Sequence, residues 1–348
     1  MRPAASGCLF CPGPGSIQPP ETLLNQTITA VAGLEAGHYT DLEHATGCTV
    51  FLCREGAVGG VDVRGGSPGT RETDLLRPVH RVDQVHAIVL SGGSAFGLDA
   101  ASGVVAYLES QGIGYKVGTT EKPVIVPIVS SAILYDLGLI TSEVRPGPDE
   151  GRSACLAASS APMTEGSVGA GTGATIAKLG GPEREVKGGI GSAAITLATG
   201  QTVAAAVAVN AVGGIWDYAN GQLLAGPRRA GGGFDDPVAL LLEGESNAPA
   251  GPVNTTIGLV ATDAELTKED ANYLARVSHD GLALAIRPCH TVRDGDTMFA
   301  LATGHKKSPA DMTTLGAAAV EVTAQAVLRA VRQATGLGGI PSISELSA

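Results

Sequence analysis

Glycine is the residue that most limits how this chain can fold. It fills 49 of the 348 positions, about twice its usual share of roughly 7%. Aromatic residues are few, with one Trp, six Tyr and five Phe. The core must therefore be built from Ala, Val, Leu and Ile packed closely around glycine. A chain of this length buries most of its unfolded surface, so we expect a large, densely packed core.

The charge balance is acidic and excludes several kinds of partner. Lys and Arg number 23 against 34 Asp and Glu, a formal net charge of −11. Phosphate backbones and anionic membrane surfaces would be repelled by this charge. No run reaches the roughly 18 apolar residues of a spanning helix, and residues 1–18 hold no apolar signal region. We predict a cytoplasmic protein without a nucleic-acid or membrane partner.

Cysteine and histidine give no support for a metal or redox site. Six cysteines in this length do not make a disulfide scaffold. Cys8 and Cys11 have C-x-x-C spacing, but no second pair accompanies them, so two thiols in a tail is the better interpretation. None of the seven histidines stands in H-x-x-x-H or H-E-x-x-H spacing. We predict no metal and no cofactor.

The order of elements indicates one α/β domain. Prolines break residues 1–26, which we predict to be a flexible tail before a single catalytic domain, 27–348. A helix is expected from Ser94 to Ser110. Ser94 would cap its start, and Gly112 would stop it shortly after Ser110. Interleaved strands and helices without a regular βαβ repeat predict packed sheets flanked by helices. Further strands are expected at 48–53, 58–63, 86–91, 124–127, 192–198, 202–209, 257–262 and 297–303, and helices at 267–286 and about 315–330.

Two glycine-rich motifs resemble known sites but lack their context. Residues 169–174 fit a loose dinucleotide pattern, yet the chain continues through Gly180-Gly181-Pro182, which cannot form the long helix required. Residues 92–96 miss the G-x-S-x-G elbow because Phe96 stands where the second glycine belongs. We predict neither a nucleotide site nor a serine triad at Ser94.

The segment Asn254-Thr255-Thr256 carries the chemistry. It follows a loop of Ala, Pro and Gly and precedes an apolar run that we expect to be a strand buried on both faces. A hydroxyl there could attack its own preceding carbonyl, shift the acyl group from N to O and let water complete the cut. The freed α-amine has a pKa near 8 and can act as base for the hydroxyl. From the residues alone, the simple beginning of a strand is the better interpretation of Thr255.

Several motifs together, spread over residues 28–341, resemble the DmpA-type L-aminopeptidase/D-esterase family. That family includes β-peptidyl aminopeptidases and hydrolases of nylon (6-aminohexanoate) oligomers. The motifs that carry the resemblance are 61–73 (VDVRGGSPGTRET), 90–98 (LSGGSAFGL), 129–136 (VSSAILYD), 168–174 (VGAGTGA), 209–210 (VN), 254–257 (NTTI) and 294–297 (DGDT).

The resemblance implies a fold and a maturation step. The family has a four-layer α/β/β/α sandwich, shared with ornithine acetyltransferases, and its members cut themselves into a large and a small subunit. Here the cut would fall between Asn254 and Thr255, giving subunits 1–254 and 255–348. Since family members assemble further, we expect a homo-oligomer, a tetramer or octamer.

The resemblance also assigns roles to the nucleophile and its nearest partners. Thr255 would be the nucleophile, and Asn210 would help to stabilise the oxyanion. By itself, Asn210 also fits an ordinary turn-capping residue. Lys178 matches a lysine beside the nucleophile in the nylon-hydrolase branch, and Lys187 is its rival because other branches keep a lysine in that motif.

The remaining assigned residues are an acidic pair and a tyrosine. Asp294 and Asp296 match a pair that orients the nucleophile or holds the substrate amine, and alternate positions in an extended segment point the same way. Without the family, Asp294-Gly295-Asp296 would be interpreted as a hairpin turn. Tyr135 would line the substrate site, or else be a core aromatic residue.

Three functions are compatible with these residues. The first is a self-processing hydrolase that cleaves small peptides, amino-acid amides or 6-aminohexanoate oligomers bearing a free amine through a Thr255 acyl-enzyme. The second is an acyltransferase of the ornithine acetyltransferase type that uses the same acyl-enzyme. The third is an uncleaved binding protein. Thr255 with paired aspartates favours the nylon-hydrolase branch, although much of the intervening sequence differs from it.

Overall fold

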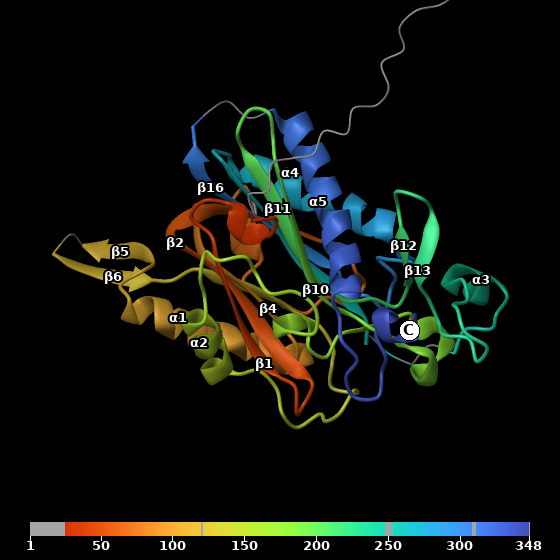
Figure 1. Ribbon diagram of the computed structural model, residues 1–348. Helices are drawn as coiled ribbons and strands as arrows, with labels where there is room; N and C mark the ends of the chain where they lie inside the picture. The colour runs from red at the N-terminus through yellow and green to blue at the C-terminus, as the bar shows by residue number, and fades with distance from the viewer. Residues whose placement is uncertain (1–24, 120, 248–250, 252, 308–310, 348) are drawn as a thin grey trace, which may run out of the picture.

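The computed structural model describes residues 25–119, 121–247, 251, 253–307 and 311–347. Nearly all of the predicted tail, with Cys8 and Cys11, lies outside these residues. Helices α4 (Lys268–Ala285) and α5 (Met312–Arg332) cover one side of a large sheet system. Helices α1 (Ala100–Ser110) and α2 (Pro148–Leu156) cover the other side (Figure 1).

Within the described residues, nine strands form one mixed sheet in the order β10-β11-β14-β16-β2-β4-β7-β3, with β1 paired to β2. The 18-residue strand β2 connects its two halves. Residues 58–63 of β2 pair with β16, whereas residues 48–52 pair with β4, and the register shifts between them. The two strands predicted at 48–53 and 58–63 are therefore one irregular strand. The bounds are β1 Glu35–Asp41, β2 Thr46–Val63, β3 Thr70–Arg71, β4 Gln84–Ser91, β7 Val129–Ile133, β10 Gly189–Thr196, β11 Thr202–Asn210, β14 Thr255–Ala264 and β16 Thr297–Lys306.

Three buried clusters of the described residues separate four layers. Along β11, Val203, Ala205 and Val207 face α4 and α5, whereas Ala204 and Ala206 face the β2–β4 half of the sheet. This alternation follows from the two-residue period of a strand. The third cluster packs β2 and β4 against α1 and α2. The structure thus confirms the expected α/β/β/α sandwich.

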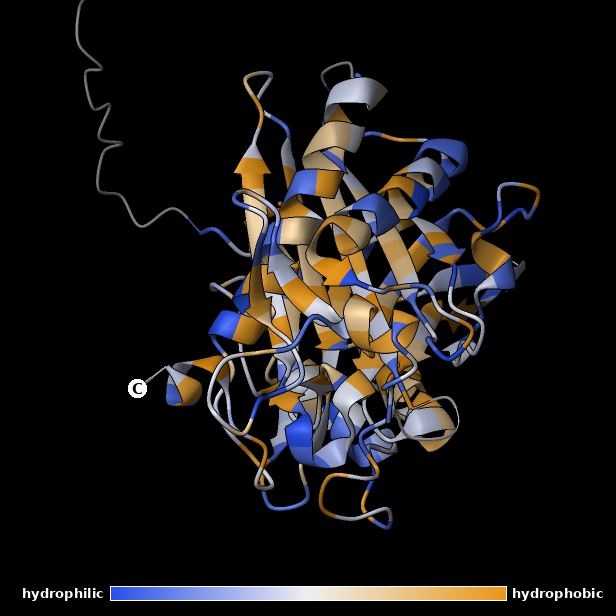
Figure 2. Ribbon diagram, turned by 90° about the vertical axis from the view of Figure 1, so that its right-hand side faces the viewer, coloured by the Kyte–Doolittle hydropathy of each residue, from blue (hydrophilic) through white to orange (hydrophobic). Residues whose placement is uncertain are grey.

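Small residues bring the layers close together. Every residue of β11 and β14 is buried, as expected for strands covered on both faces, and the central strands carry the hydrophobic colour in Figure 2. A Cβ on Gly191 of β10 would lie 2.2 Å from the Ala326 carbonyl oxygen of α5. Helix α5 therefore lies directly on β10, which explains why this chain needs so much glycine.

The helix predictions hold for α4 and α5 but not for the start of α1. Thr267 and Asp270 form a capping box before α4. Residues Ser94–Asp99 form a 3-10 helix, η3, and the α-helix begins only at Ala100. Ser94 has φ +52° and its side chain does not cap the helix, so its predicted capping role is wrong. The preceding Gly93, at φ +82°, makes the turn.

The glycine-rich segment 169–174 has no dinucleotide fold. It forms η4 (Gly169–Gly171) and leads into strand β8 (Thr175–Ile176), which is followed by two three-residue 3-10 helices and not by an α-helix. The other short elements are η1 Ile28–Ala30, η2 Asp74–Leu76, β5 Tyr115–Thr119, β6 Lys122–Val126, η5 Lys178–Gly180, η6 Pro182–Arg184, β9 Val186–Lys187, β12 Gly214–Asp217, β13 Gln222–Ala225, α3 Pro237–Leu242, β15 Ile286–Arg287 and α6 Ile343–Leu346.

Helix α5 reaches the length and apolar composition of a membrane span, which the sequence analysis did not find. However, 67% of its apolar window is buried inside the molecule, as in a core helix. No group of three or more His, Cys, Asp or Glu side chains that could hold a metal ion occurs among the described residues.

Candidate active site

The site lies at one end of three neighbouring strands, where β11 ends and β14 and β16 begin. Strands β11 and β14 are antiparallel, so Asn210, the last residue of β11, pairs with Thr255, the first of β14. Strands β14 and β16 are parallel, so Asn254 forms a bridge with Asp294 just before both begin. Topology thus brings together residues that are up to 84 positions apart in the sequence.

The Thr255 hydroxyl is next to the peptide bond that was predicted to be cut. Thr255 is 4% exposed, and its Oγ1 donates a hydrogen bond to the carbonyl oxygen of Asn254. The backbone N–H of Gly295 donates to the same oxygen at 3.1 Å. An N→O acyl shift requires a nucleophile next to the carbonyl group and a fixed N–H donor to the carbonyl oxygen. Both are present here.

Gly295 leaves no room for a side chain. A Cβ there would lie 2.7 Å from the Ser67 carbonyl oxygen and 2.9 Å from Thr255 Oγ1. We expect Gly295→Ala to slow self-cleavage at least tenfold, because the methyl group displaces the hydroxyl or the N–H donor. Gly138→Ala is the control, since its Cβ would meet Tyr135 Cε1 at an ordinary 3.6 Å. Timed mass spectra of both variants make the test, and equal rates would show that Gly295 has no such role.

Lys178 and Asn210 hold the chain just before the predicted cut. The Lys178 ammonium donates to Asn210 Oδ1 at 2.8 Å, to the Val253 carbonyl at 2.9 Å and to the Asn210 carbonyl at 3.4 Å. Asn210 Nδ2 donates to the carbonyls of Val253, at 3.3 Å, and Tyr135, at 3.0 Å. Asn210 is therefore a central hydrogen-bonding residue of the site rather than a simple turn cap.

Burial disfavours the charged form of Lys178 and lowers its pKa to about 8. The negative charges of Glu185, Asp294 and Asp136 act in the opposite direction and raise it. Its three hydrogen bonds all go to oxygen atoms that can only accept. Three donated hydrogen bonds require three N–H groups, so the lysine that makes them is the charged form.

Lys187 has different partners. Its ammonium donates to the carbonyls of Gly171, Ala174 and Gly188 at 3.0, 2.8 and 2.9 Å. It thus binds the glycine-rich segment rather than residues 253–255. Of the two rival lysines, the structure places Lys178 beside the predicted cut.

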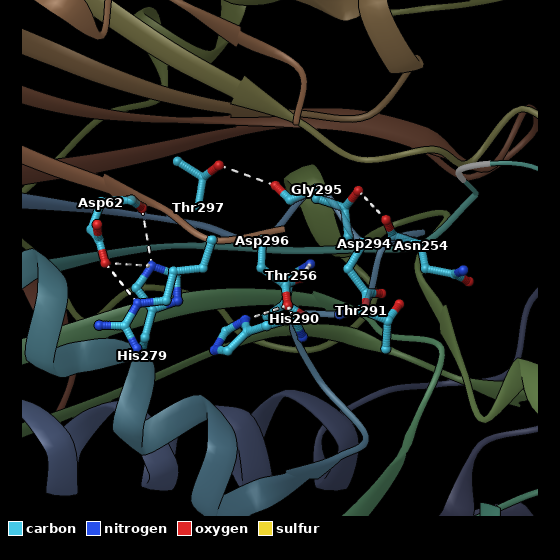
Figure 3. A network of polar contacts seen from close by, with 12 residues as sticks. Asp62, Asn254, Thr256, His279, His290, Thr291, Asp294, Gly295, Asp296 and Thr297 are labelled. Atoms are coloured by element: carbon cyan, nitrogen blue, oxygen red, sulfur yellow. Dashed lines mark hydrogen bonds and ion pairs between the residues drawn. The ribbon is translucent and has the colours of Figure 1, made fainter. Parts of the chain in front are cut away.

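The two aspartates point to the same side of their segment and fix its neighbours. Asp296 accepts from the N–H of Thr256 at 2.7 Å with one oxygen and from the N–H and Nδ1 of His290 with the other. Asp294 accepts from the Thr291 N–H at 2.7 Å (Figure 3). The pair therefore anchors the start of β14 and the 290–291 loop.

The hairpin-turn interpretation of residues 294–296 is wrong. A hairpin turn there would pair β16 with the strand before it in the sequence, β15. Strand β15 instead pairs with β12, in another sheet. The segment instead lies beside Asn254, where it can supply the Gly295 N–H.

A cavity of about 420 Å³ adjoins Lys178 and Val253. Tyr135 lines it, as expected, together with two acids that the sequence analysis did not single out, Asp136 and Glu185. Asp136 accepts from Thr46 Oγ1 at 2.8 Å and from the Gly93 N–H at 2.7 Å. Burial raises its pKa to about 6. The apolar wall of the cavity includes Leu139 and Ile340.

Self-cleavage should be fastest between about pH 6 and pH 8. Burial and the Asp296 carboxylate raise the pKa of Asp294 to about 6, whereas burial lowers that of Lys178 to about 8. Both groups are charged only between these values, so the rate should rise through the first and fall through the second. Both shifts cost folding stability in this window. The Asp294 cost develops as the pH rises toward 6 and persists above it, whereas the Lys178 cost is relieved only as the pH rises above 8. Cleavage of isolated precursor, followed by mass in buffers on either side of both values, makes the measurement. A rate that keeps rising above pH 8 would show that neutral Lys178 is the active form.

Sequence reasoning missed Gly295 and His290. Gly295 stood between two noted aspartates, and a glycine there is a signal for close backbone approach. His290 belongs to no spacing motif, so only the fold shows that its ring bonds to Asp296 at 2.8 Å.

Similar proteins are known over most of the chain. The model of peptidase family S58 matches residues 26–342. An uncharacterized aminopeptidase of Mycobacterium leprae is 40% identical, with 91% of this chain and 92% of the relative covered. A 6-aminohexanoate-oligomer endohydrolase of Agromyces sp. is 33% identical, with 85% and 82% covered.

Solved structures show the same fold. A Burkholderia sp. beta-aminopeptidase has a TM-score of 0.64 at 23% identity, with 91% of this chain and 90% of the other covered. The L-aminopeptidase D-Ala-esterase/amidase of Ochrobactrum anthropi, described as a variant of the Ntn hydrolase fold, has a TM-score of 0.65 at 20% identity, with 90% and 87% covered.

Proposed function

Because the chain belongs to peptidase family S58 and is a hydrolase of amide bonds, we propose that it cuts itself between Asn254 and Thr255 and then uses Thr255 as its catalytic nucleophile. The observation that carries the proposal is the Asn254 carbonyl oxygen, which accepts from both the Thr255 hydroxyl and the Gly295 N–H. The carbonyl oxygen is thus hydrogen-bonded both to the hydroxyl that would attack the carbonyl carbon and to the N–H that would stabilise the oxyanion.

The processing step follows from this arrangement. Thr255 Oγ1 bonds to the Asn254 carbonyl carbon, the C–N bond breaks, and the hydroxyl proton passes to the leaving nitrogen. Water then hydrolyses the ester, leaving a carboxylate on Asn254 and a free amine on Thr255. A fixed N–H donor such as that of Gly295 contributes a factor of about 10²–10³ to steps of this kind.

The mature reaction repeats the same chemistry on a substrate. The freed amine of Thr255, with a pKa near 8, takes the hydroxyl proton as the oxygen attacks the substrate amide. The nitrogen of the cleaved amide bond takes this proton and leaves as an amine. Water then hydrolyses the acyl-enzyme. Asn210 Nδ2, which binds the Val253 carbonyl in the uncut chain, can turn to the substrate oxyanion once that segment moves away.

We propose substrates that carry a free amine: small peptides, amino-acid amides or ω-amino-acid oligomers, including 6-aminohexanoate oligomers. The cavity beside Lys178 combines apolar walls at Leu139 and Ile340 with the carboxylates of Asp136 and Glu185. An alkyl chain suits the first and an ammonium group the second. The net charge of −11 also favours cationic substrates.

Glu185 is the acid best placed to bind the substrate ammonium. Its carboxylate has no hydrogen-bond partner in the described part of the chain, whereas the Asp136 carboxylate already accepts two hydrogen bonds. We expect Glu185→Gln to raise KM for free-amine substrates roughly tenfold, because one charged hydrogen bond is lost. Glu183→Gln is the control, since Glu183 lines a different cavity with Arg184 and Arg228. Equal KM values for the two variants would contradict this role.

Hydrolysis and acyl transfer use the same acyl-enzyme and differ only in the acceptor. Release of the acyl group from an amino-acid amide, measured with and without an added amino-acid acceptor, separates them. We expect release without an acceptor. Negligible release would favour a transferase instead.

We further propose that the enzyme works in the cytoplasm as a homo-oligomer, a tetramer or octamer. Light scattering of the purified protein measures the oligomeric state.

A further inference from the structure

We propose that His279 and His290 share a hydrogen bond between their facing ring nitrogens, and that this imidazole pair is the positioning device for Thr255. The inference concerns residues of the proposed self-processing site and rests on that function only for its kinetic consequence. Neither ring is bonded to Thr255, so both are positioning residues.

The two rings come from different elements and meet edge to face. His279, on α4, is completely buried, and His290 lies in the loop before β16. Their centroids are 4.8 Å apart and the ring planes are inclined by 71°. Asp62 lies at the outer end of the pair and Asp296 at the inner end (Figure 3).

Each ring has one satisfied nitrogen and one without a partner. His279 Nε2 bonds to the Asp62 carbonyl oxygen at 3.0 Å, and His290 Nδ1 bonds to Asp296 Oδ2 at 2.8 Å. Nδ1 of His279 and Nε2 of His290 are both buried and have no partner among the described residues. A buried polar atom left unpaired is costly, and one shared hydrogen bond would satisfy both.

The outer partners decide which nitrogen carries a proton. A carbonyl oxygen only accepts, so His279 Nε2 carries the hydrogen and its Nδ1 presents a lone pair. Burial lowers the pKa of His279 to about 4, helped by the charge of His290, so this ring stays neutral. Asp62 Oδ2, at 3.7 Å from His279 Nε2, is itself bonded to Arg64 Nε at 2.8 Å.

His290 has the complementary state. Burial alone would lower its pKa, but the bond and charge of Asp296, with a smaller contribution from Cys289, raise it to about 10. At neutral pH both of its ring nitrogens therefore carry hydrogens. The Nε2–H of His290 is thus a donor without another partner, and Nδ1 of the adjacent His279 ring is the acceptor that we propose for it.

The pair acts on Thr255 through Asp296. The Asp296 oxygen that does not bind His290 accepts from the Thr256 N–H at 2.7 Å, the amide directly after the nucleophile. A His290 ring that is held by His279 keeps this buried carboxylate in place. The chain from Asp62 to Thr256 therefore joins β2, α4 and the 290 loop to the first residues of β14.

Nitrogen-15 NMR of the full chain tests the hydrogen bond directly. We expect a scalar coupling between His290 Nε2 and His279 Nδ1, two protonated nitrogens on His290 and one on His279. Absence of the coupling overturns the proposal. This measurement does not depend on whether the chain cleaves itself.

Matched variants test the positioning role. His279→Asn keeps an acceptor near the Nδ1 position, whereas His279→Phe removes it. We expect His279→Phe to speed amide exchange at Thr256 and to slow self-cleavage, each by roughly 10–100-fold, and His279→Asn to stay within a few-fold of the unaltered chain. Ser278→Ala is the control, since this buried hydroxyl bonds only within α4, to the Leu274 carbonyl.

The outcomes separate this inference from the proposed function. Unchanged Thr256 exchange in a folded His279→Phe chain overturns the positioning role even when the coupling is present. Equal losses in His279→Asn and His279→Phe also overturn it, because they indicate packing rather than an acceptor. If the unaltered chain never cleaves, the proposed function fails, while the coupling and the exchange rates still decide the inference.

Discussion

Replacing Thr255 with alanine should leave the chain uncut and inactive. The Thr255 hydroxyl is the group that bonds to the Asn254 carbonyl, and no attack is possible without it. The unaltered chain of 34.8 kDa should give fragments of roughly 25 and 9 kDa, since 348 residues divide into 254 and 94. Thr255→Ala should show one mass, unchanged over days, and no hydrolysis of amino-acid amides. Intact mass under denaturing conditions is the first measurement to make.

Two neighbouring variants make this experiment specific. Thr255→Ser keeps the hydroxyl and should still cleave. Thr256→Val removes the next hydroxyl, equally buried at 1% exposure, but keeps the amide that bonds to Asp296, and should cleave normally. A Thr255→Ala chain that cuts itself at the same bond, or retains full activity, would refute the role of Thr255.

Replacing Lys178 with methionine should give the second largest loss. The ammonium binds the Val253 carbonyl and both oxygens of Asn210, so its removal frees the segment before the cut and takes away the cation nearest to it. We expect self-cleavage to slow by roughly 10²-fold, the usual effect of losing one fixed donor near a reacting carbonyl. The time course of fragment formation measures the rate.

Lys187→Met provides the contrast, because this lysine is equally buried and also donates three hydrogen bonds. Its partners are carbonyls of the glycine-rich segment, so its loss should lower the free energy of unfolding by roughly 2–4 kcal/mol. The protein that does fold should cleave at nearly the unaltered rate. The opposite pattern, with slow cleavage only in Lys187→Met, would make Lys187 the site lysine.

The local pattern of the sequence was sufficient for most elements. The polar-to-apolar transition at Thr255 predicted the buried strand β14, and Thr267 with Asp270 predicted the start of α4. Errors occurred where a long-range contact overrides local preference. Residues 48–63 form one strand because β2 pairs with β4 along its first part and β16 along its last. Ser94 does not cap α1 because the turn at Gly93 is followed by 3-10 geometry.

By itself the sequence determined the chemistry that is available: a threonine at the start of a buried strand, an asparagine at the end of another, two rival lysines and a pair of aspartates. The family motifs determined the fold class and the class of reaction. Residue type and short-range spacing are enough for these conclusions, because they depend on what each side chain can do.

Only the tertiary structure decided which of these groups meet. It placed Lys178 rather than Lys187 against Val253, brought the Gly295 N–H to the Asn254 carbonyl, and aligned His279 with His290. The first two contacts join segments that are distant in the sequence through strand register, and the third depends on how α4 packs beside the 290 loop. Register and packing depend on the whole fold at once, and so no local pattern of residues encodes them.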